Sequence, residues 1–346
     1  MATYDFLFNA LGLRDWCDIA VKGSDRPMSM AELLAKSKGQ SDLEFTLWEL
    51  PFPSLDALNK SCASFPQSRD LTAGVEQSFL AIKGALRFIL DPMTQPLSWT
   101  LETALIAFEV TPWWLMIPIL MAIVYVTSKS SKLVFFVTTC IVFLAAIDHY
   151  DHAIQTLAII FVCASLCVLF GVPIGIAMSR SNTLQRMTIP ILDMLQTLPP
   201  FVYLIPLIFL FSVTEPKLYG IAIILYAIVP VIRLTNLGIR LVDKDVIEAA
   251  DSFGMTDKQK LFGVQIPLAL PNIMAGVNQT IMMSLAMVVI ASLVSAPGLG
   301  VLVLRGIRNL ELGVGLISGL GIVLLAIILD RVTKAALDQI NAAHKY

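Results

Sequence analysis

Long apolar stretches fill the chain from about residue 110 onward. A bilayer core is about 30 Å thick, and a helix needs about 20 apolar residues to cross it. Backbone polar groups can be satisfied there only within helices or closed barrels. The pattern therefore predicts an all-α polytopic membrane protein with about seven spans, at 112–127, 132–147, 153–178, 187–212, 217–237, 271–296 and 312–329. The first two are short, and a single re-entrant pair is the alternative there.

A different pattern precedes residue 110. Residues 1–109 carry 14 acidic and 9 basic side chains with interspersed prolines. Ser29 to Glu32 is a capping-box pattern that opens a short helix. Apolar residues at helical spacing then predict two amphipathic stretches, Val75, Phe79, Ile82, Leu86 and Ile89, followed by Leu97, Leu101, Leu105 and Phe108. The first stretch fits a helix packed on its own protein or one lying in the membrane interface. We predict a partly helical tail, 1–109, and a transmembrane domain, 110–346.

Composition and charge narrow the class of protein. Hydrophobic residues make up 57% of the chain and charged residues 14%, with a mean hydropathy of +0.78. Ordinary soluble globules are about a quarter charged, so that class is excluded. The net charge of −2 lacks the basic excess of a nucleic-acid-binding protein. The five cysteines form no C-x-x-C pair, and no third well-placed histidine accompanies His149 and His152. We therefore expect neither a disulfide framework nor a metal site.

Positive side chains in short loops predict the orientation. Lysines and arginines lie between spans one and two, three and four, and five and six. The loops at 148–152 and 214–217 carry little positive charge, although the loop before span seven contains Arg305 and Arg308. The positive-inside rule then places the amino terminus outside and the carboxyl terminus in the cytoplasm.

The cytoplasmic loop 242–270 is too polar to span a bilayer and too patterned to be a linker. Lys244 to Phe253 predicts a helix with Gly254 at the C′ position, where glycine adopts the left-handed conformation without steric cost. Thr256 and Gln259 predict a capping box for a second short helix.

Two prolines, Pro267 and Pro271, are expected to end this second helix before span six, because proline lacks the N–H that a helix interior requires. The result would be a rigid helix-turn-helix exposed on the cytoplasmic face. Such an element needs a partner to explain it.

One motif runs through the loop. Glu248-Ala-Ala is followed after three residues by Gly254, and after nine more by Val264-Gln-Ile-Pro267. This resembles the EAA motif of bacterial ABC importer permeases, which ends in I-x-L-P; Val and Ile replace Ile and Leu here. The glutamate offers an acceptor to a basic group, two alanines permit close approach, and the glycine fixes the turn. The resemblance assigns ATPase coupling to Glu248, Ala249, Ala250, Gly254 and Pro267.

Further segments, 193–204, 232–239, 252–262 and 271–292, narrow the resemblance. They are similar to the permease subunit of glycine betaine/proline betaine ABC importers (ProW type), over roughly residues 97–338. The resemblance implies a type I ABC importer permease fold in the bacterial inner membrane. It also implies a periplasmic substrate-binding protein that delivers a quaternary ammonium osmolyte, and cytoplasmic ATPase subunits. A homodimer is expected, because one EAA loop per chain must serve two ATPases.

Polar side chains within the spans are candidates for the translocation path. A carboxylate near a helix centre costs about 2.5–3.5 kcal/mol, so Asp193 should face protein or water as a gate or helix contact, or snorkel to the interface. Tyr203 could offer its ring to a methylated ammonium, or simply pack. For the other residues the alternative is interhelical hydrogen bonding. The candidates are Asp193, Gln196, Tyr203, Asn278, Gln279 and Ser284.

The sequence favours a non-catalytic translocation subunit over two rival classes. An ion-gradient-driven secondary transporter predicts inverted repeats and paired midplane carboxylates, yet only Asp193 lies well within a span. A membrane enzyme needs a hydrolytic constellation, and none occurs. No G-x-x-x-x-G-K-[ST] motif is present, so ATP and Mg would be bound by the partner ATPase. The solute stays open among glycine betaine, proline betaine, choline, carnitine and trimethylamine N-oxide.

Overall fold

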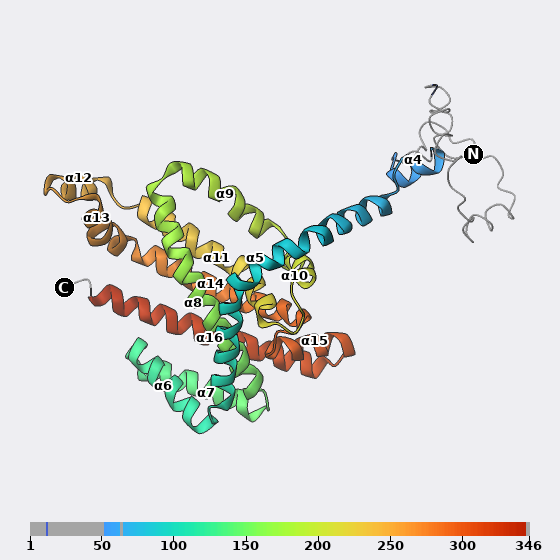
Figure 1. Ribbon diagram of the computed structural model, residues 1–346. Helices are drawn as coiled ribbons and strands as arrows, with labels where there is room; N and C mark the ends of the chain where they lie inside the picture. Colours follow the sequence, from blue (N-terminus) through green and yellow to red (C-terminus); the bar gives the residue numbers. More distant parts are fainter. Residues whose placement is uncertain (1–11, 13–51, 63–64, 344–346) are drawn as a thin grey trace. The chain divides into compact units, whose positions relative to one another are not determined.

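The computed structural model describes residue 12 and residues 52–62 and 65–343 (Figure 1). All regular secondary structure in these ranges is helical, which confirms the all-α class. The capping box predicted at Ser29 to Glu32 lies outside the described residues. The chain divides into two compact units, Met1–Leu86 and Arg87–Tyr346.

In the first unit, α4 (Leu55–Ser61) is joined to the start of the next helix by polar contacts. The backbone N–H and the hydroxyl of Ser68 donate to the carboxylate of Asp56 at 2.8 and 2.7 Å. Cys62 is buried and disulfide-bonded. The expectation that the cysteines form no disulfide is therefore wrong for Cys62. Sequence spacing does not decide this, because a disulfide requires only that two thiols meet in the fold.

The helices of the rest of the chain follow one another through short turns. The long helix α5 belongs to both units and begins at Ser68. The elements are α5 (Ser68–Val110), α6 (Trp113–Ser128), α7 (Ser131–Ala146), α8 (Tyr150–Arg180), α9 (Asn182–Thr197), the 3-10 helix η2 (Pro200–Tyr203), α10 (Leu204–Leu210), α11 (Pro216–Arg240), α12 (Lys244–Ser252), α13 (Asp257–Lys260), the π-helix η3 (Leu261–Gln265), α14 (Ile266–Ala291), the 3-10 helix η4 (Ser292–Val294), α15 (Leu299–Asn309) and α16 (Leu312–Ala343).

Four of the expected spans are long apolar helices. These are α8, α11, the continuous stretch Asp257–Val294, and Leu312–Gln339 of α16. The fourth expected span is instead a pair, Asn182–Thr197 and Pro200–Leu210, bent by 104°. The break coincides with Pro199 and Pro200, which cannot donate the backbone hydrogen bonds of a continuous helix.

The first two expected spans are shorter than a bilayer is thick. Helices α6 and α7 have 16 residues each, and 16 residues of helix cover about 24 Å. Helix α6 also forms a bent pair with α5, at 113°. By length and composition, the described residues contain four spans, or up to six if each bent pair is one, rather than seven.

The second compact unit begins at Arg87, earlier than the boundary predicted near residue 110. Leu97 and Leu101 of α5 pack on Gly220 near the start of α11. A methyl group added at Gly220 would lie 2.6 Å from Cδ1 of Leu101 and 3.2 Å from Cδ2 of Leu97. The second predicted amphipathic stretch therefore contacts α11 through Leu97, which is half-buried, and Leu101, which is fully buried.

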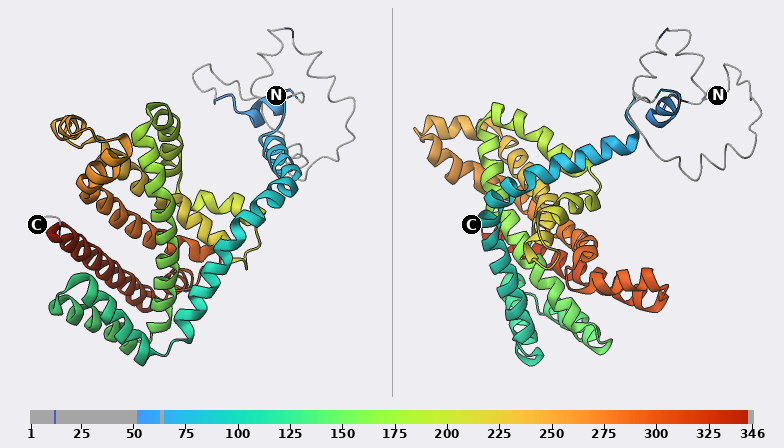
Figure 2. Two further views of the ribbon diagram at one scale, coloured as in Figure 1. Left: turned by 60° about the vertical axis from the view of Figure 1, so that its left-hand side comes forward. Right: turned by 45° about the vertical axis from the view of Figure 1, so that its right-hand side comes forward.

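Helix α11 packs between α8 and α14, and small residues let the three backbones approach closely (Figure 2). A methyl group built on Gly175 of α8 would lie 2.6 Å from Cβ of Thr235 and 2.7 Å from the carbonyl oxygen of Ile232. On the α14 side, one built on Gly276 would lie 3.0 Å from Cα of Val231. These contacts fix the position of α11 in the bundle.

Replacing Gly175 with alanine should destabilise the bundle, because the added methyl group meets backbone atoms that cannot move aside. We expect a loss of about 1–3 kcal/mol, typical of an overpacked interior. Thermal unfolding of the purified protein in detergent measures the change. Gly313→Ala on α16, where nothing lies within 4 Å of the added atom, is the control. Equal melting temperatures for both variants would contradict the close packing of α8 on α11.

Candidate coupling and translocation sites

The first helix of the loop at 242–270 ends in a left-handed turn. Helix α12 begins after Asp243, whose carboxylate accepts a hydrogen bond from the N–H of Asp245 at 3.0 Å. At its end Gly254 has φ +72° and donates its N–H to the carbonyl of Asp251 at 2.9 Å. The N–H of the next residue, Met255, donates to the carbonyl of Ala250 at 3.2 Å. This pair of bonds is the Schellman motif, and it satisfies two of the carbonyls left free at a helix end.

The second helix starts from the predicted capping box. The hydroxyl of Thr256 accepts from the N–H of Gln259, and the side chain of Gln259 accepts from the N–H of Thr256 at 2.9 Å. The ammonium of Lys260 pairs with Asp251 on α12 and, at 3.6 Å, with Asp257. These contacts hold α13 against α12, so the two helices form one rigid element.

The prediction that Pro267 and Pro271 end this helix is wrong. Helix α13 continues through the π-turn η3 into α14, where Pro267 occupies the first turn and Pro271 lies inside. Proline removes a backbone donor, and its ring clashes with the carbonyl four residues earlier. The wider π-helix η3 ends at Gln265, two residues before Pro267, where regular α-helical bonding is interrupted. The loop at 242–270 is therefore continuous with the apolar helix α14.

The outward face of α12 carries an apolar stripe beside acidic side chains. Val246, Ala249 and Phe253 are all exposed, Phe253 at 85%. Their spacing of three and four residues places them on one face of the helix. Glu248 is exposed as well, whereas Ala250 is buried at 5%. Only the first alanine of the motif is thus available for a close approach by another protein, and the second packs inward.

The candidate path residues of the broken span lie in different surroundings. Asp193 on α9 forms an ion pair with Arg233 on α11, and both side chains are partly exposed. Gln196 is half-buried. Tyr203 is 7% exposed, and its hydroxyl has no hydrogen-bond partner within the described residues. The structure thus connects Asp193 to α11 through an ion pair. Helical spacing did not predict this contact, because the two residues are 40 positions apart.

The three candidates on α14 face different directions. Asn278 donates to Asp330 of α16 at 2.9 Å and accepts from the hydroxyl of Thr333 at 2.7 Å. Gln279 is exposed, while Ser284 is fully buried and donates to the carbonyl of Thr280 in its own helix. They do not form one site. Asp330 and Thr333 were missed at the sequence level, although a carboxylate following a long apolar run is a signal for such a contact.

The described residues contain no group of three or more histidine, cysteine or carboxylate side chains that could hold a metal ion. His149 instead lies within hydrogen-bond distance of the carbonyl of Ile147, at 2.6 Å, and of the hydroxyl of Ser318, at 3.2 Å. The polar turn before α8 is thus engaged in helix contacts.

Comparison with known proteins identifies relatives that match half of the chain or more. The profile of the family described as "Binding-protein-dependent transport system inner membrane component" matches residues 167–342. The glycine betaine/proline betaine transport system permease protein ProW of Escherichia coli K12 is 48% identical over 193 residues, which are 56% of this chain and 54% of ProW. The alignment thus spans about half the length of that relative. The glycine betaine/carnitine transport permease protein GbuB of Listeria monocytogenes is 41% identical over 232 residues, 66% of this chain and 82% of GbuB.

Among solved structures, an inward-facing conformation of the MetNI methionine ABC transporter matches with a TM-score of 0.50 and 18% identity. The match covers 56% of this chain and 95% of the solved chain. It supports the type I ABC importer permease fold.

Proposed function

Because the chain belongs to the family of binding-protein-dependent transport system inner membrane components, we propose that it is the membrane-spanning permease subunit of an ATP-driven importer. The matched residues, 167–342, contain the whole helix-turn-helix loop and the membrane helices on either side of it. The observation that carries the proposal is the exposed face of α12 beside the Gly254 turn, continuous with α14. Movement of the loop by a partner would be passed directly to a membrane helix.

The proposed solute is a quaternary ammonium osmolyte of the glycine betaine or proline betaine type. Glycine betaine occurs in the names of the relatives ProW and GbuB. A relative from Ruegeria pomeroyi, 40% identical over 194 residues, is named for trimethylamine N-oxide. These compounds share a methylated, polar nitrogen centre, which defines the class that we propose. The family assignment supports this function and gives no support to the ion-gradient alternative.

We propose three protein partners for this subunit. A cytoplasmic ABC ATPase would bind ATP and Mg and dock on α12, so this chain itself would hold no cofactor. A periplasmic substrate-binding protein would deliver the solute from the other side. A second copy of the chain would complete the path, since each copy carries one coupling loop in its described residues. The lipid bilayer surrounds the assembly.

Reconstitution tests the function. Proteoliposomes that contain the permease and its ATPase should take up glycine betaine only under two conditions. ATP must be present on the side of the membrane that carries the ATPase, and the loaded binding protein must be present on the opposite side. Vanadate should abolish this uptake. Uptake that survives vanadate but is lost when ion gradients are dissipated would contradict the proposal and favour a secondary transporter.

We further propose that the amino terminus is outside and the carboxyl terminus is cytoplasmic. In cells, an impermeant thiol reagent should label Thr214→Cys in the turn before α11 without permeabilisation, and Lys258→Cys in α13 only after it. Both positions are exposed, whereas Cys140, Cys163 and Cys167 are buried, so background labelling should be low. Cys62 should add no background label either, because it is buried and disulfide-bonded. The reverse pattern would contradict this orientation.

A further inference from the structure

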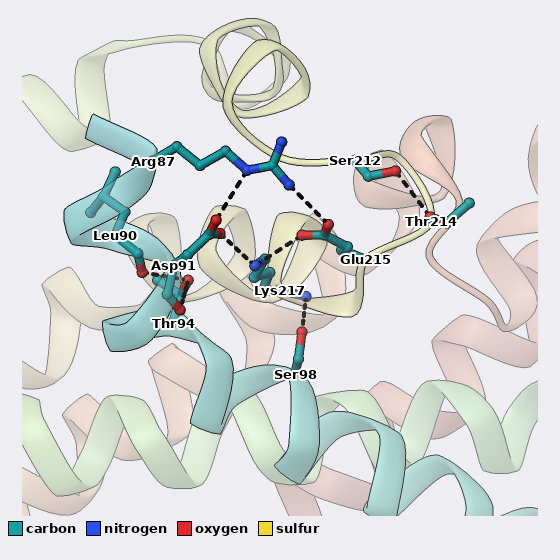
Figure 3. Close-up of polar contacts among 9 residues, drawn as sticks. All are labelled: Arg87, Leu90, Asp91, Thr94, Ser98, Ser212, Thr214, Glu215 and Lys217. Atoms are coloured by element: carbon teal, nitrogen blue, oxygen red, sulfur yellow. Dashed lines mark hydrogen bonds and ion pairs between the residues drawn. The ribbon is translucent and has the colours of Figure 1, made fainter. Parts of the chain in front are cut away.

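A buried lysine joins α5 to the start of α11 (Figure 3). The side chain of Lys217 is only 4% exposed, and its ammonium lies 2.7 Å from Asp91 and 2.9 Å from Glu215. Arg87 completes the group, 3.0 Å from Asp91 and 3.5 Å from Glu215. We call these four residues the α5–α11 cluster. Its two positive and two negative charges balance.

Other contacts make this junction a precise one. The backbone N–H of Lys217 donates to the hydroxyl of Ser98 at 3.3 Å, and the ammonium lies 5.1 Å from the centre of the Phe211 ring. A buried ammonium is costly unless opposite charges and hydrogen bonds surround it, so loss of Asp91 would leave Lys217 poorly compensated. Asp91 therefore holds the start of α11 in place.

The cluster fixes one exposed turn. Ser212, Val213 and Thr214 are exposed between buried Phe211 and the cluster residue Glu215. Within the turn, the hydroxyls of Ser212 and Thr214 are 3.0 Å apart (Figure 3). A turn tied down on both sides is preorganised, and a preorganised surface binds a partner with less loss of conformational entropy.

The position of this turn indicates its partner. Helix α11 has 25 residues and is thus about 37 Å long, enough to cross a bilayer. The turn precedes its first residue and the α12 loop follows its last. The two therefore lie on opposite sides of the membrane. If the ATPase docks on α12, the partner available to the turn is the solute-binding protein.

We infer that the α5–α11 cluster is a positioning device that presents the turn Ser212–Glu215 to the solute-binding protein. This inference rests on the proposed function. It assigns a role to the segment of α5 from Arg87 to Leu101, which lies outside the residues 167–342 matched by the family. Asp91 and Lys217 are positioning residues in this arrangement, because they act through the geometry of the turn.

The test is a titration of solute-loaded binding protein in proteoliposomes that contain the permease and its ATPase. In Asp91→Asn, the half-saturating concentration of binding protein should rise about fivefold or more, while the maximum uptake rate changes less than about twofold. Glu76→Gln removes one negative charge from an exposed position on the same helix and should change neither quantity. Asp193→Asn on α9, which removes the ion pair with Arg233 near the other end of α11, should instead change the maximum rate.

A second variant keeps the test informative if Asp91→Asn does not insert. Asp91→Asn/Lys217→Met removes the buried charge together with its partner, so the interior keeps no unpaired ammonium. It should show the same rise in half-saturating concentration, because the buried ion pair that joins Asp91 of α5 to Lys217 of α11 is gone. An unchanged half-saturating concentration, or a fall in maximum rate alone, would overturn the inference. Wild-type uptake that needs no binding protein would overturn the proposed function as well.

Discussion

Gly254→Val should uncouple ATP hydrolysis from solute uptake while the protein still inserts into the membrane. Gly254 has φ +72°, and nothing lies within 4 Å of the position its side chain would occupy. The free-energy cost of a side chain there therefore comes from the backbone conformation and not from crowding by neighbouring atoms. It is about 1–2 kcal/mol for a residue forced into the left-handed region. Valine should relieve this strain by opening the turn, which displaces α13 from α12. We expect uptake by the reconstituted complex to fall by about tenfold or more.

Two matched variants isolate the cause. Gly263→Val makes the same change in the same loop, at an exposed glycine with open space and no left-handed φ, and should retain most of the uptake. Gly254→Asn should be intermediate, because asparagine tolerates the left-handed conformation better than valine. Normal solute-stimulated ATP hydrolysis in Gly254→Val would show that this turn does not couple the two activities.

Glu248→Arg tests the charge on the same surface. Glu248 is exposed on α12 and has no ion pair with any described residue, so it is free to meet a basic group of the ATPase. Reversal of its charge should weaken copurification of the ATPase and lower uptake, whereas Glu248→Gln should have a smaller effect, since like charges at an interface repel. Unchanged copurification for Glu248→Arg would remove this residue from the docking surface.

The sequence predicted the secondary structure of the loop at 242–270 well, because the signals for it are local. The Gly254 turn, the Thr256–Gln259 capping box and the start of α12 at Lys244 each depend on residues within one or two helical turns. The prediction that Pro267 ends the second helix was wrong. A proline can be accommodated by a change from α-helix to π-helix, which local propensity does not reveal.

Contacts between distant segments were the part that could not be predicted. Lys217 follows a short turn in the sequence and gives no sign of being buried, because its compensating partner Asp91 lies 126 residues away. The same holds for Asn278 and Asp330. A hydrophobic pattern indicates that a polar residue in a span needs a partner, but the packing of the helices decides which residue that partner is.

The ion pair between Asp193 and Arg233 should be required for transport. It joins α9 of the bent pair to α11. Helix α11 therefore forms ion pairs near both of its ends, through Lys217 at the start and Arg233 near the other end. Asp193→Arg would place like charges in the same position. Two unit charges 4 Å apart interact by about 4 kcal/mol at an effective dielectric constant of 20. The side chains are 53% and 38% exposed, so solvent screening reduces this value. A remaining effect of about 1.4 kcal/mol still corresponds to a tenfold loss of uptake rate.

A charge exchange decides whether the pair itself matters. Asp193→Arg/Arg233→Asp restores opposite charges on the two helices, and we expect it to recover uptake to within about threefold of wild type, while each single reversal stays about tenfold lower.

Asp193→Asn separates the two roles left open for this residue. If the pair is a gate, this variant should let glycine betaine leak down its gradient without ATP, because the neutral side chain no longer holds α9 to α11. If the pair only joins the helices, the folded amount in the membrane should fall and no leak should occur. Full uptake activity in both single charge reversals would contradict both roles. It would mean that the Asp193 side chain only extends to the membrane interface and that other residues close the path.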